Sequence, residues 1–156
     1  MPDFNLLHKL KDILAQNVDR AVKAARITEA IRDEGGYRWV GIYDVDIHRA
    51  LVSNLAWSGP GAPAFLTFPI TKGLTSRAIS EKKTINVGDV ANAPDYLTAL
   101  DSTRAEIIVP ILDDACSRVV GTIDVESEHL NAFDSRAQAI LEECARLLAD
   151  FSTGGD

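Results

Sequence analysis

The segment AEIIVPILDDACSRVVGTIDVES, residues 105–127, holds two apolar stretches joined by a short turn of small and polar residues. Both stretches are rich in β-branched residues, which favour strands, and a short turn folds two strands back on each other. We therefore predict an antiparallel hairpin with strands at 105–112 and 118–127. Because side chains alternate along a strand, Asp124 and Glu126 share one face, and Glu106 opens the neighbouring strand.

A second hairpin is predicted upstream. The segment YRWVGIYDVD, residues 37–46, is aromatic and β-branched, and residues 51–57 return after a turn. Alternation places Trp39, Gly41 and Tyr43 on one face of the first strand. Between the two hairpins we expect a Gly- and Pro-containing loop at 58–64, an extended segment at 65–70, a short helix at 74–81, a strand at 84–87 and a loop with a helical turn at 89–101.

Amphipathic helices are expected at both ends of the chain. Apolar residues spaced three or four apart predict one helix at about 3–34, interrupted near Asn17, and another at about 134–151 with Asp134 as its N-cap. Hairpins between terminal helices indicate an α+β fold with a mostly antiparallel sheet. The 156 residues suit a single domain, 1–156, with its core at about 37–128. We expect the terminal helices to cover one sheet face and the long loops to roof a pocket on the other.

The composition argues against several classes of partner. Lys+Arg 16 against Asp+Glu 23 gives a net charge of −7, whereas nucleic acids and anionic membranes attract a basic surface. The longest apolar run, 107–112, is far shorter than the roughly 20 residues that span a bilayer, and the N-terminus lacks signal-peptide features. Two cysteines in an acidic, unexported chain indicate reduced thiols, so we expect a cytoplasmic protein.

The sequence motifs predict no cofactor and no metal. Residues 59–64 match a G-x-G-x-x-A dinucleotide pattern, but they contain two prolines and precede an extended segment, not a helix. The histidines are dispersed and no Cys-x-x-Cys occurs, which argues against zinc. Cys144 lies on the apolar face of the last helix, as a core residue does. Cys116 adjoins two carboxylates, which raise the pKa of a thiol and so lower its reactivity.

Acidic and aromatic residues form the most informative constellation. If the faces of the two hairpins coincide, Glu106, Asp124 and Glu126 meet Trp39 and Tyr43. Such a site suits an ammonium ligand, through charge-assisted hydrogen bonds and cation–π contact. The alternative interpretation is a solvated sheet face with carboxylates at its edge.

Several ordered segments resemble the GAF domain family, over about residues 5 to 150. The resemblance implies a central antiparallel sheet of about six strands, terminal helices on one face and a ligand pocket on the other. The matching segments are Arg38–Tyr43, Phe68–Leu74, Asp89–Val90, Glu106–Pro110, Val120–Glu126 and Phe133–Asp134.

Within that family the chain is most similar to the free methionine-(R)-sulfoxide reductases. The resemblance implies a ligand pocket built from Trp39, Tyr43, Glu106, Asp124 and Glu126. It also implies cysteines at three further positions, but this chain has Phe65, Thr75 and Ala99 there. A hydroxyl or a methyl group cannot form a sulfenic acid or a disulfide.

The expected function is therefore that of a sensory binding module for an amine-bearing metabolite, which signals through a separate partner. Two alternatives remain open: a divergent reductase that uses Cys116, and a ligand-free dimerisation module. We also expect a homodimer through the first and last helices, unless the apolar stripes of those helices are used up inside the monomer.

Overall fold

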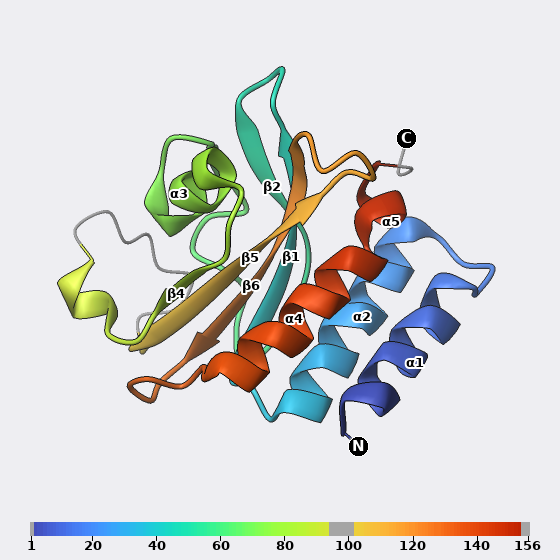
Figure 1. Ribbon diagram of the computed structural model, residues 1–156, viewed down its shortest axis with the longest axis horizontal. Helices are drawn as coiled ribbons and strands as arrows, with labels where there is room; N and C mark the ends of the chain where they lie inside the picture. The colour runs from blue at the N-terminus through green and yellow to red at the C-terminus, as the bar shows by residue number, and fades with distance from the viewer. Residues whose placement is uncertain (1, 94–101, 154–156) are drawn as a thin grey trace.

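The computed structural model describes residues 2–93 and 102–153 (Figure 1). Five helices, a short 3-10 turn and six strands follow one another in these residues. In chain order they are α1 (Pro2–Leu14), α2 (Arg20–Gly35), β1 (Trp39–Asp46), β2 (Leu51–Ser58), β3 (Thr67–Pro69), α3 (Gly73–Glu81), β4 (Ile85–Val87), η1 (Val90–Asn92), β5 (Ala105–Leu112), β6 (Val119–Ser127), α4 (Ser135–Leu147) and α5 (Ala149–Thr153).

The six strands form one antiparallel sheet in the order β3-β2-β1-β6-β5-β4. The two predicted hairpins, β1–β2 and β5–β6, are both present. They meet where β1 pairs with β6, with Trp39 opposite Glu126 and Gly41 opposite Asp124. This pairing joins segments that lie far apart in sequence, and it brings the faces of the two hairpins into one surface.

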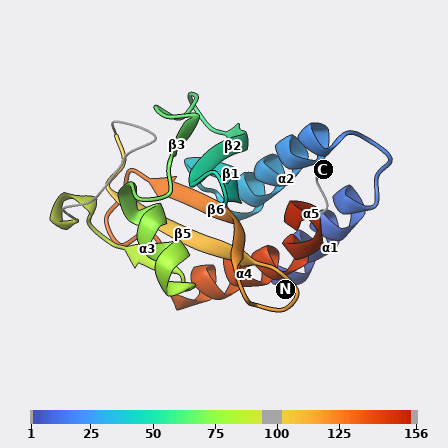
Figure 2. The ribbon, with the colours of Figure 1, turned by 90° about the horizontal axis from the view of Figure 1, so that it is seen from above.

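Helices cover the two faces of the sheet unequally (Figure 2). On one face α2 and α4 pack on the sheet and α1 packs against both, with Ile31, Ile123 and Leu141 fully buried among them. On the other face α3 contributes Leu74 and Ala78 to a smaller apolar cluster over β4 and β5. The second face is the one that carries Trp39 and Tyr43, beside Val52 of β2.

The terminal helices differ in detail from the prediction. The expected helix at 3–34 is two helices, and its predicted interruption near Asn17 lies between Leu14 and Arg20. Helix α2 ends with Gly36 in the left-handed conformation at φ 66°, as predicted for a glycine stop. The expected last helix at 134–151 ends at Leu147, and α5 continues in a new direction. Asp134 caps α4 as predicted, since its side chain accepts a hydrogen bond from the Ala137 N–H at 2.8 Å.

Contacts from Arg20 at the start of α2 position α5. Arg20 donates a hydrogen bond to the Phe151 carbonyl at 3.3 Å, and its guanidinium lies 5.0 Å from the centre of the Phe151 ring. These contacts hold α5 against the beginning of α2. In the described part of the chain, no helix is long and apolar enough to cross a membrane.

Candidate functional site

The structure brings all five predicted site residues to one face of the sheet. Glu106 lies opposite Glu126 across β5 and β6, and Glu126 lies opposite Trp39 across β6 and β1. Carboxylate oxygens of Glu106, Asp124 and Glu126 all lie within 4.8 Å of one another. The three residues are 1%, 6% and 1% exposed. The solvated sheet face that the sequence left open is therefore wrong, and we call these three residues the acidic cluster.

The acidic cluster is short of hydrogen-bond donors. Both carboxylate oxygens of Glu106 and Oδ1 of Asp124 are buried without a hydrogen-bond partner. Glu126 has a hydrogen-bond donor, because the Thr103 hydroxyl donates to its carboxylate. Leaving a buried polar atom unpaired costs about 1–3 kcal/mol, and more for a charged group. An unpaired set of buried acceptors is therefore a place that a donor-rich or cationic ligand would stabilise.

Burial changes the protonation of the cluster. Burial, and then the neighbouring Asp124 charge, raises the pKa of Glu106 well above its ordinary value. Burial also raises the pKa of Asp124, to about 6, although the neighbouring Glu106 carboxyl opposes the rise. Like charges this close cannot all ionise when they are buried, so the cluster retains a proton near neutral pH.

Trp39 and Tyr43 form the apolar wall beside the cluster. The Trp39 Nε1–H donates to the Gly61 carbonyl at 3.0 Å, which holds the 59–64 loop against the indole. The ring lies over Gly41, where a Cβ would come within 2.4 Å of it. The Tyr43 ring packs edge-on against Phe68 at 5.8 Å. Burial, with the Asp124 charge as the next cause, raises the Tyr43 pKa, so its hydroxyl stays protonated.

The chemistry of these residues suits a cation. An ammonium group offers up to three N–H donors to the carboxylates, and its carbon skeleton can lie on the aromatic rings. The same oxygens are the donors that hard divalent ions prefer, and they form the one candidate metal-binding group among the described residues. The aromatic wall favours the organic cation, because a hydrated metal ion gains nothing from an indole.

Both cysteines lie away from the acidic cluster. Cys144 is fully buried on the opposite face of the sheet, and burial raises the pKa of its thiol to about 12. Cys116 is exposed in the β5–β6 turn. Glu106 lies near the start of strand β5, and the turn follows the end of that strand at Leu112. At a rise of about 3.4 Å per residue, the strand separates the Cys116 thiol from the acidic cluster by about 20 Å.

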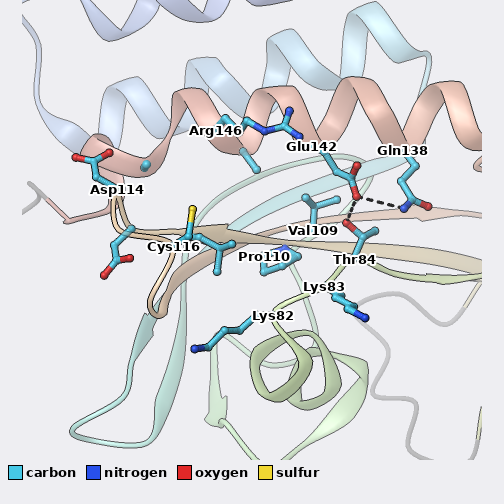
Figure 3. Close-up of a pocket in the computed structure, with 14 residues that line it drawn as sticks. Lys82, Lys83, Thr84, Val109, Pro110, Asp114, Cys116, Gln138, Glu142 and Arg146 are labelled. Atoms are coloured by element: carbon cyan, nitrogen blue, oxygen red, sulfur yellow. Dashed lines mark hydrogen bonds between the residues drawn. The ribbon is translucent and has the colours of Figure 1, made fainter.

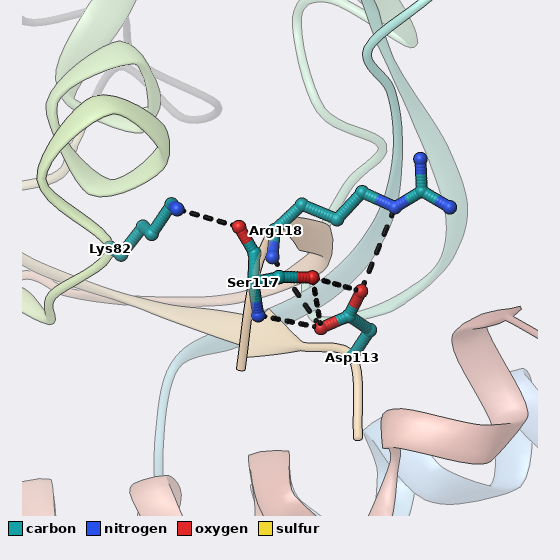
Figure 4. A network of polar contacts seen from close by, with 4 residues as sticks. All are labelled: Lys82, Asp113, Ser117 and Arg118. Atoms are coloured by element: carbon teal, nitrogen blue, oxygen red, sulfur yellow. Dashed lines mark hydrogen bonds and ion pairs between the residues drawn. The ribbon is translucent and has the colours of Figure 1, made fainter. Parts of the chain in front are cut away.

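Polar contacts among Lys82, Asp113, Ser117 and Arg118 surround the turn that carries Cys116 (Figure 4). The Asp113 carboxylate accepts hydrogen bonds from the Ser117 backbone N–H at 2.8 Å and from its hydroxyl at 2.9 Å. These bonds lower the pKa of Asp113. Lys82, at the end of α3, donates to the Ser117 carbonyl at 2.6 Å. The turn is thus tied to both its own strands and α3.

A separate cavity of about 610 Å³ lies between α4 and the edge of β5 (Figure 3). Its lining includes Val109, Pro110 and Cys116 but no residue of the acidic cluster. Glu142 already has partners there, since Thr84 and Gln138 donate to its carboxylate at 2.5 and 3.2 Å. Glu142 in this cavity is therefore hydrogen-bonded, unlike Glu106 of the acidic cluster.

A sequence model of the GAF domain matches residues 19–150. The chain belongs to the GAF domain family. It is 28% identical over 144 residues to GAF domain-containing protein A of Dictyostelium discoideum, a match that covers 92% of this chain and 88% of the relative. It is also 30% identical over 112 residues to the free methionine-R-sulfoxide reductase of Saccharomyces cerevisiae, covering 70% of this chain and 60% of that protein.

Solved GAF structures agree with this assignment. The free methionine-R-sulfoxide reductase of Neisseria meningitidis, solved in complex with its substrate, superposes with a TM-score of 0.84 at 28% identity, covering 96% of this chain and 87% of the other. The GAF domain of an Acinetobacter phosphoenolpyruvate-protein phosphotransferase gives the same TM-score at 15% identity, with 96% and 90% coverage. The second likeness supports the GAF fold alone.

Sequence reasoning missed two polar residues of this GAF site. Thr122 is fully buried on β6 opposite Tyr43, and its hydroxyl has no partner. Thr122 lies two residues before Asp124 on the same strand, so the alternation of side chains could have predicted that it faces the site. Thr103, which donates to Glu126, precedes β5 and carries no such signal. Of the positions where the resemblance implied cysteines, Thr75 is buried at the start of α3 and Phe65 is exposed, while Ala99 lies outside the described residues.

Proposed function

We propose that this GAF domain is a regulatory binding module for a small amine-bearing metabolite, whose ammonium group binds the acidic cluster. The observation that carries the proposal is the set of buried, unpartnered oxygens on Glu106 and Asp124. A stable domain seldom retains such atoms unless something satisfies them in its working state. Members of the GAF family generally bind small molecules in a regulatory role, which fits this proposal.

Charge makes the proposed ligand class specific. An anion would meet three carboxyls at close range, whereas a neutral ligand would leave their repulsion in place. A cation removes that repulsion and supplies the missing donors. Trp39 and Tyr43 then contact its apolar part, because their strand β1 is paired with β6, which carries Asp124 and Glu126.

A calorimetric screen of amines and amino acids at pH 8 tests the proposal. We expect at least one ammonium compound to bind, and its neutral or carboxylate analogue to fail. In Asp124→Asn and in Glu126→Gln, the binding should weaken by about 2–5 kcal/mol, the cost of truncating one partner of a buried charge pair. Asp33→Asn, which changes an exposed carboxyl of α2, is the matched control and should bind as the parent does. Equal binding to the parent and to the variant that combines Asp124→Asn with Glu126→Gln would refute the proposal.

A divergent free methionine-R-sulfoxide reductase is the second candidate, favoured by the identity to proteins of that name. Thiol attack on a substrate in the acidic cluster would need a cysteine within bonding reach. Cys116 lies about 20 Å away along β5, and Cys144 is buried beneath the other face. These positions favour the binding module over the reductase.

A homodimer remains part of the proposal. Helix α2 and the residues before it present an exposed apolar stripe, spaced three and four apart, made of Val18, Ala21, Val22 and Ala25. Val18 and Val22 are 36% and 38% exposed, so the stripe is not used up inside the monomer. A second copy packed along α2 would bury it. Sedimentation at tens of micromolar should show a dimer that Val22→Asp disrupts and Ile47→Asp, in the β1–β2 turn, does not. A parent that stays monomeric would contradict the dimer.

A further inference from the structure

The candidate site is closed in this structure. Trp39 is fully buried, and no residue of the acidic cluster is more than 6% exposed. A ligand of the proposed class therefore reaches the carboxyls only if part of the cover moves. Residues 59–65 run between β2 and β3 and lie against Trp39, and we call this segment the strap.

The strap lies directly on the indole of Trp39. A Cβ at Gly59 would come within 2.4 Å of Cδ1 of that ring, so the backbone of the strap touches one edge of the indole. The Gly61 carbonyl accepts the hydrogen bond from Nε1–H at 3.0 Å. The opposite edge of the ring lies over Gly41, where a Cβ would come within 2.4 Å of Cη2. The indole is thus held between the strap and the floor of the site.

The register of the sheet connects this ring to the acidic cluster. Trp39 lies opposite Glu126, and Gly41 lies opposite Asp124, across β1 and β6. Residues directly opposite each other in an antiparallel pair share a face and have Cβ atoms about 4.5–5.5 Å apart. The indole therefore borders two of the three carboxyls, and lifting the strap uncovers that border.

Few interactions fasten the strap between its ends. Within the described part of the chain, the bond between Gly61 and Trp39 is the one hydrogen bond that any strap residue makes. Pro63 is the one buried residue of the strap. Both ends are anchored, since Ser58 belongs to β2 and the Leu66 carbonyl continues the β2–β3 ladder. A segment with so few buried contacts opens locally at a lower free energy than the sheet below it.

We infer that the strap is a lid, which opens by breaking the hydrogen bond between Trp39 and Gly61, admits the amine to the acidic cluster and closes over it. The inference rests on the proposed function for the class of ligand, but the opening itself needs no ligand. Opening exposes the indole N–H to water, whereas the sheet keeps its own hydrogen bonds. Exchange of that N–H with solvent deuterium therefore reports the opening of the strap alone.

The test follows hydrogen exchange of the Trp39 Nε1–H by NMR in the full chain without ligand. After correction for intrinsic rates, this group should exchange at least about tenfold faster than the slowest backbone amides of β1 and β6, because those wait for global unfolding. Pro60→Gly frees an exposed strap residue and should speed the indole exchange by about two- to fivefold. Gly61→Ala should slow it by about twofold, because the added Cβ meets nothing within 4 Å and reduces the freedom of the open strap.

Two further variants make the measurement specific. His48→Gly is the matched control, because it frees an exposed residue in the β1–β2 turn, at the other end of β1 from Trp39. It should leave the exchange of the Trp39 indole unchanged. Trp57→Phe removes the second indole of the chain and so assigns the Trp39 signal.

Ethylamine is the probe for the closing of the lid. At saturation it should slow the exchange of the Trp39 indole in the parent, because the bound amine holds the strap closed, and it should have less effect in Asp124→Asn.

Two failures are distinguishable. If the indole exchanges no faster than the slowest amides, or if ethylamine binds in calorimetry without slowing its exchange, the lid is overturned and the proposed function stands. If no amine binds in calorimetry, the proposed function falls, and indole exchange faster than that of the slowest amides still supports the opening of the strap.

Discussion

Replacing Asp124 by asparagine should stabilise the empty protein while it weakens ligand binding. The Asp124 carboxyl has a pKa raised from 3.8 to about 6, because it is buried. A carboxyl whose pKa is higher in the folded state binds its proton more tightly there. The folded protein is therefore favoured in acid, and that stability is lost as the pH rises from about 4 through about 6. The asparagine side chain of the variant cannot ionise, so the variant does not lose this stability as the pH rises.

The size of the effect follows from the two pKa values. A rise from 3.8 to about 6 corresponds to about 3 kcal/mol between the ionised and protonated states. The free energy of unfolding of the variant minus that of the parent should therefore be more favourable above pH 7 than at pH 4, by up to about 3 kcal/mol. In a domain of this size each kcal/mol shifts Tm by about 2–4 °C, so a gain of about 6–12 °C is expected.

Thermal and urea unfolding at pH 4 and pH 8, without ligand, are the assays. Asp33→Asn, an exposed carboxyl on α2, should show no comparable change between the two pH values. A Tm difference between Asp124→Asn and the parent that is no more favourable to the variant at pH 8 than at pH 4 would refute the predicted stabilisation. Ligand should reverse the order, because the parent then gains binding energy that the variant lacks.

Three further results are expected. Amine affinity should fall below about pH 6, because Asp124 becomes protonated there. Binding at neutral pH should release a proton from Glu106, so the calorimetric heat should depend on the ionisation enthalpy of the buffer. A binding heat that is the same in all buffers would contradict this. Gly41→Ala should destabilise the protein by about 1–3 kcal/mol and weaken amine binding, since its Cβ would overlap the Trp39 ring; an unchanged Tm would show that the ring moves freely. The protein should not reduce free methionine sulfoxide in a thioredoxin-coupled assay, and turnover that is lost in Cys116→Ser would overturn that expectation.

The strand content and the face of each site residue could be predicted because alternation is local. Once 37–46 and 118–127 are predicted as strands, the common face of Trp39 and Tyr43 and that of Asp124 and Glu126 follow from the period of two. The interruption near Asn17 and the Asp134 cap were readable for the same reason. Each depends on residues within one or two turns of the chain.

The meeting of the two faces could not be read from local patterns. It depends on β1 pairing with β6, about 80 residues later, in a register that puts Gly41 opposite Asp124. The contact between Gly61 and Trp39 is equally non-local, because a loop with two prolines has no period that points to a partner. Burial of the acidic cluster was also unexpected from composition, since three carboxyls in water would ordinarily repel one another outward.

A crystal structure of the protein with its tightest-binding amine tests the central claim most directly. The ligand nitrogen should lie within about 2.7–3.1 Å of oxygens from Glu106, Asp124 and Glu126, with the ligand's carbon skeleton against Trp39. A ligand seated instead in the cavity between α4 and β5, with the acidic cluster still unpartnered, would contradict it.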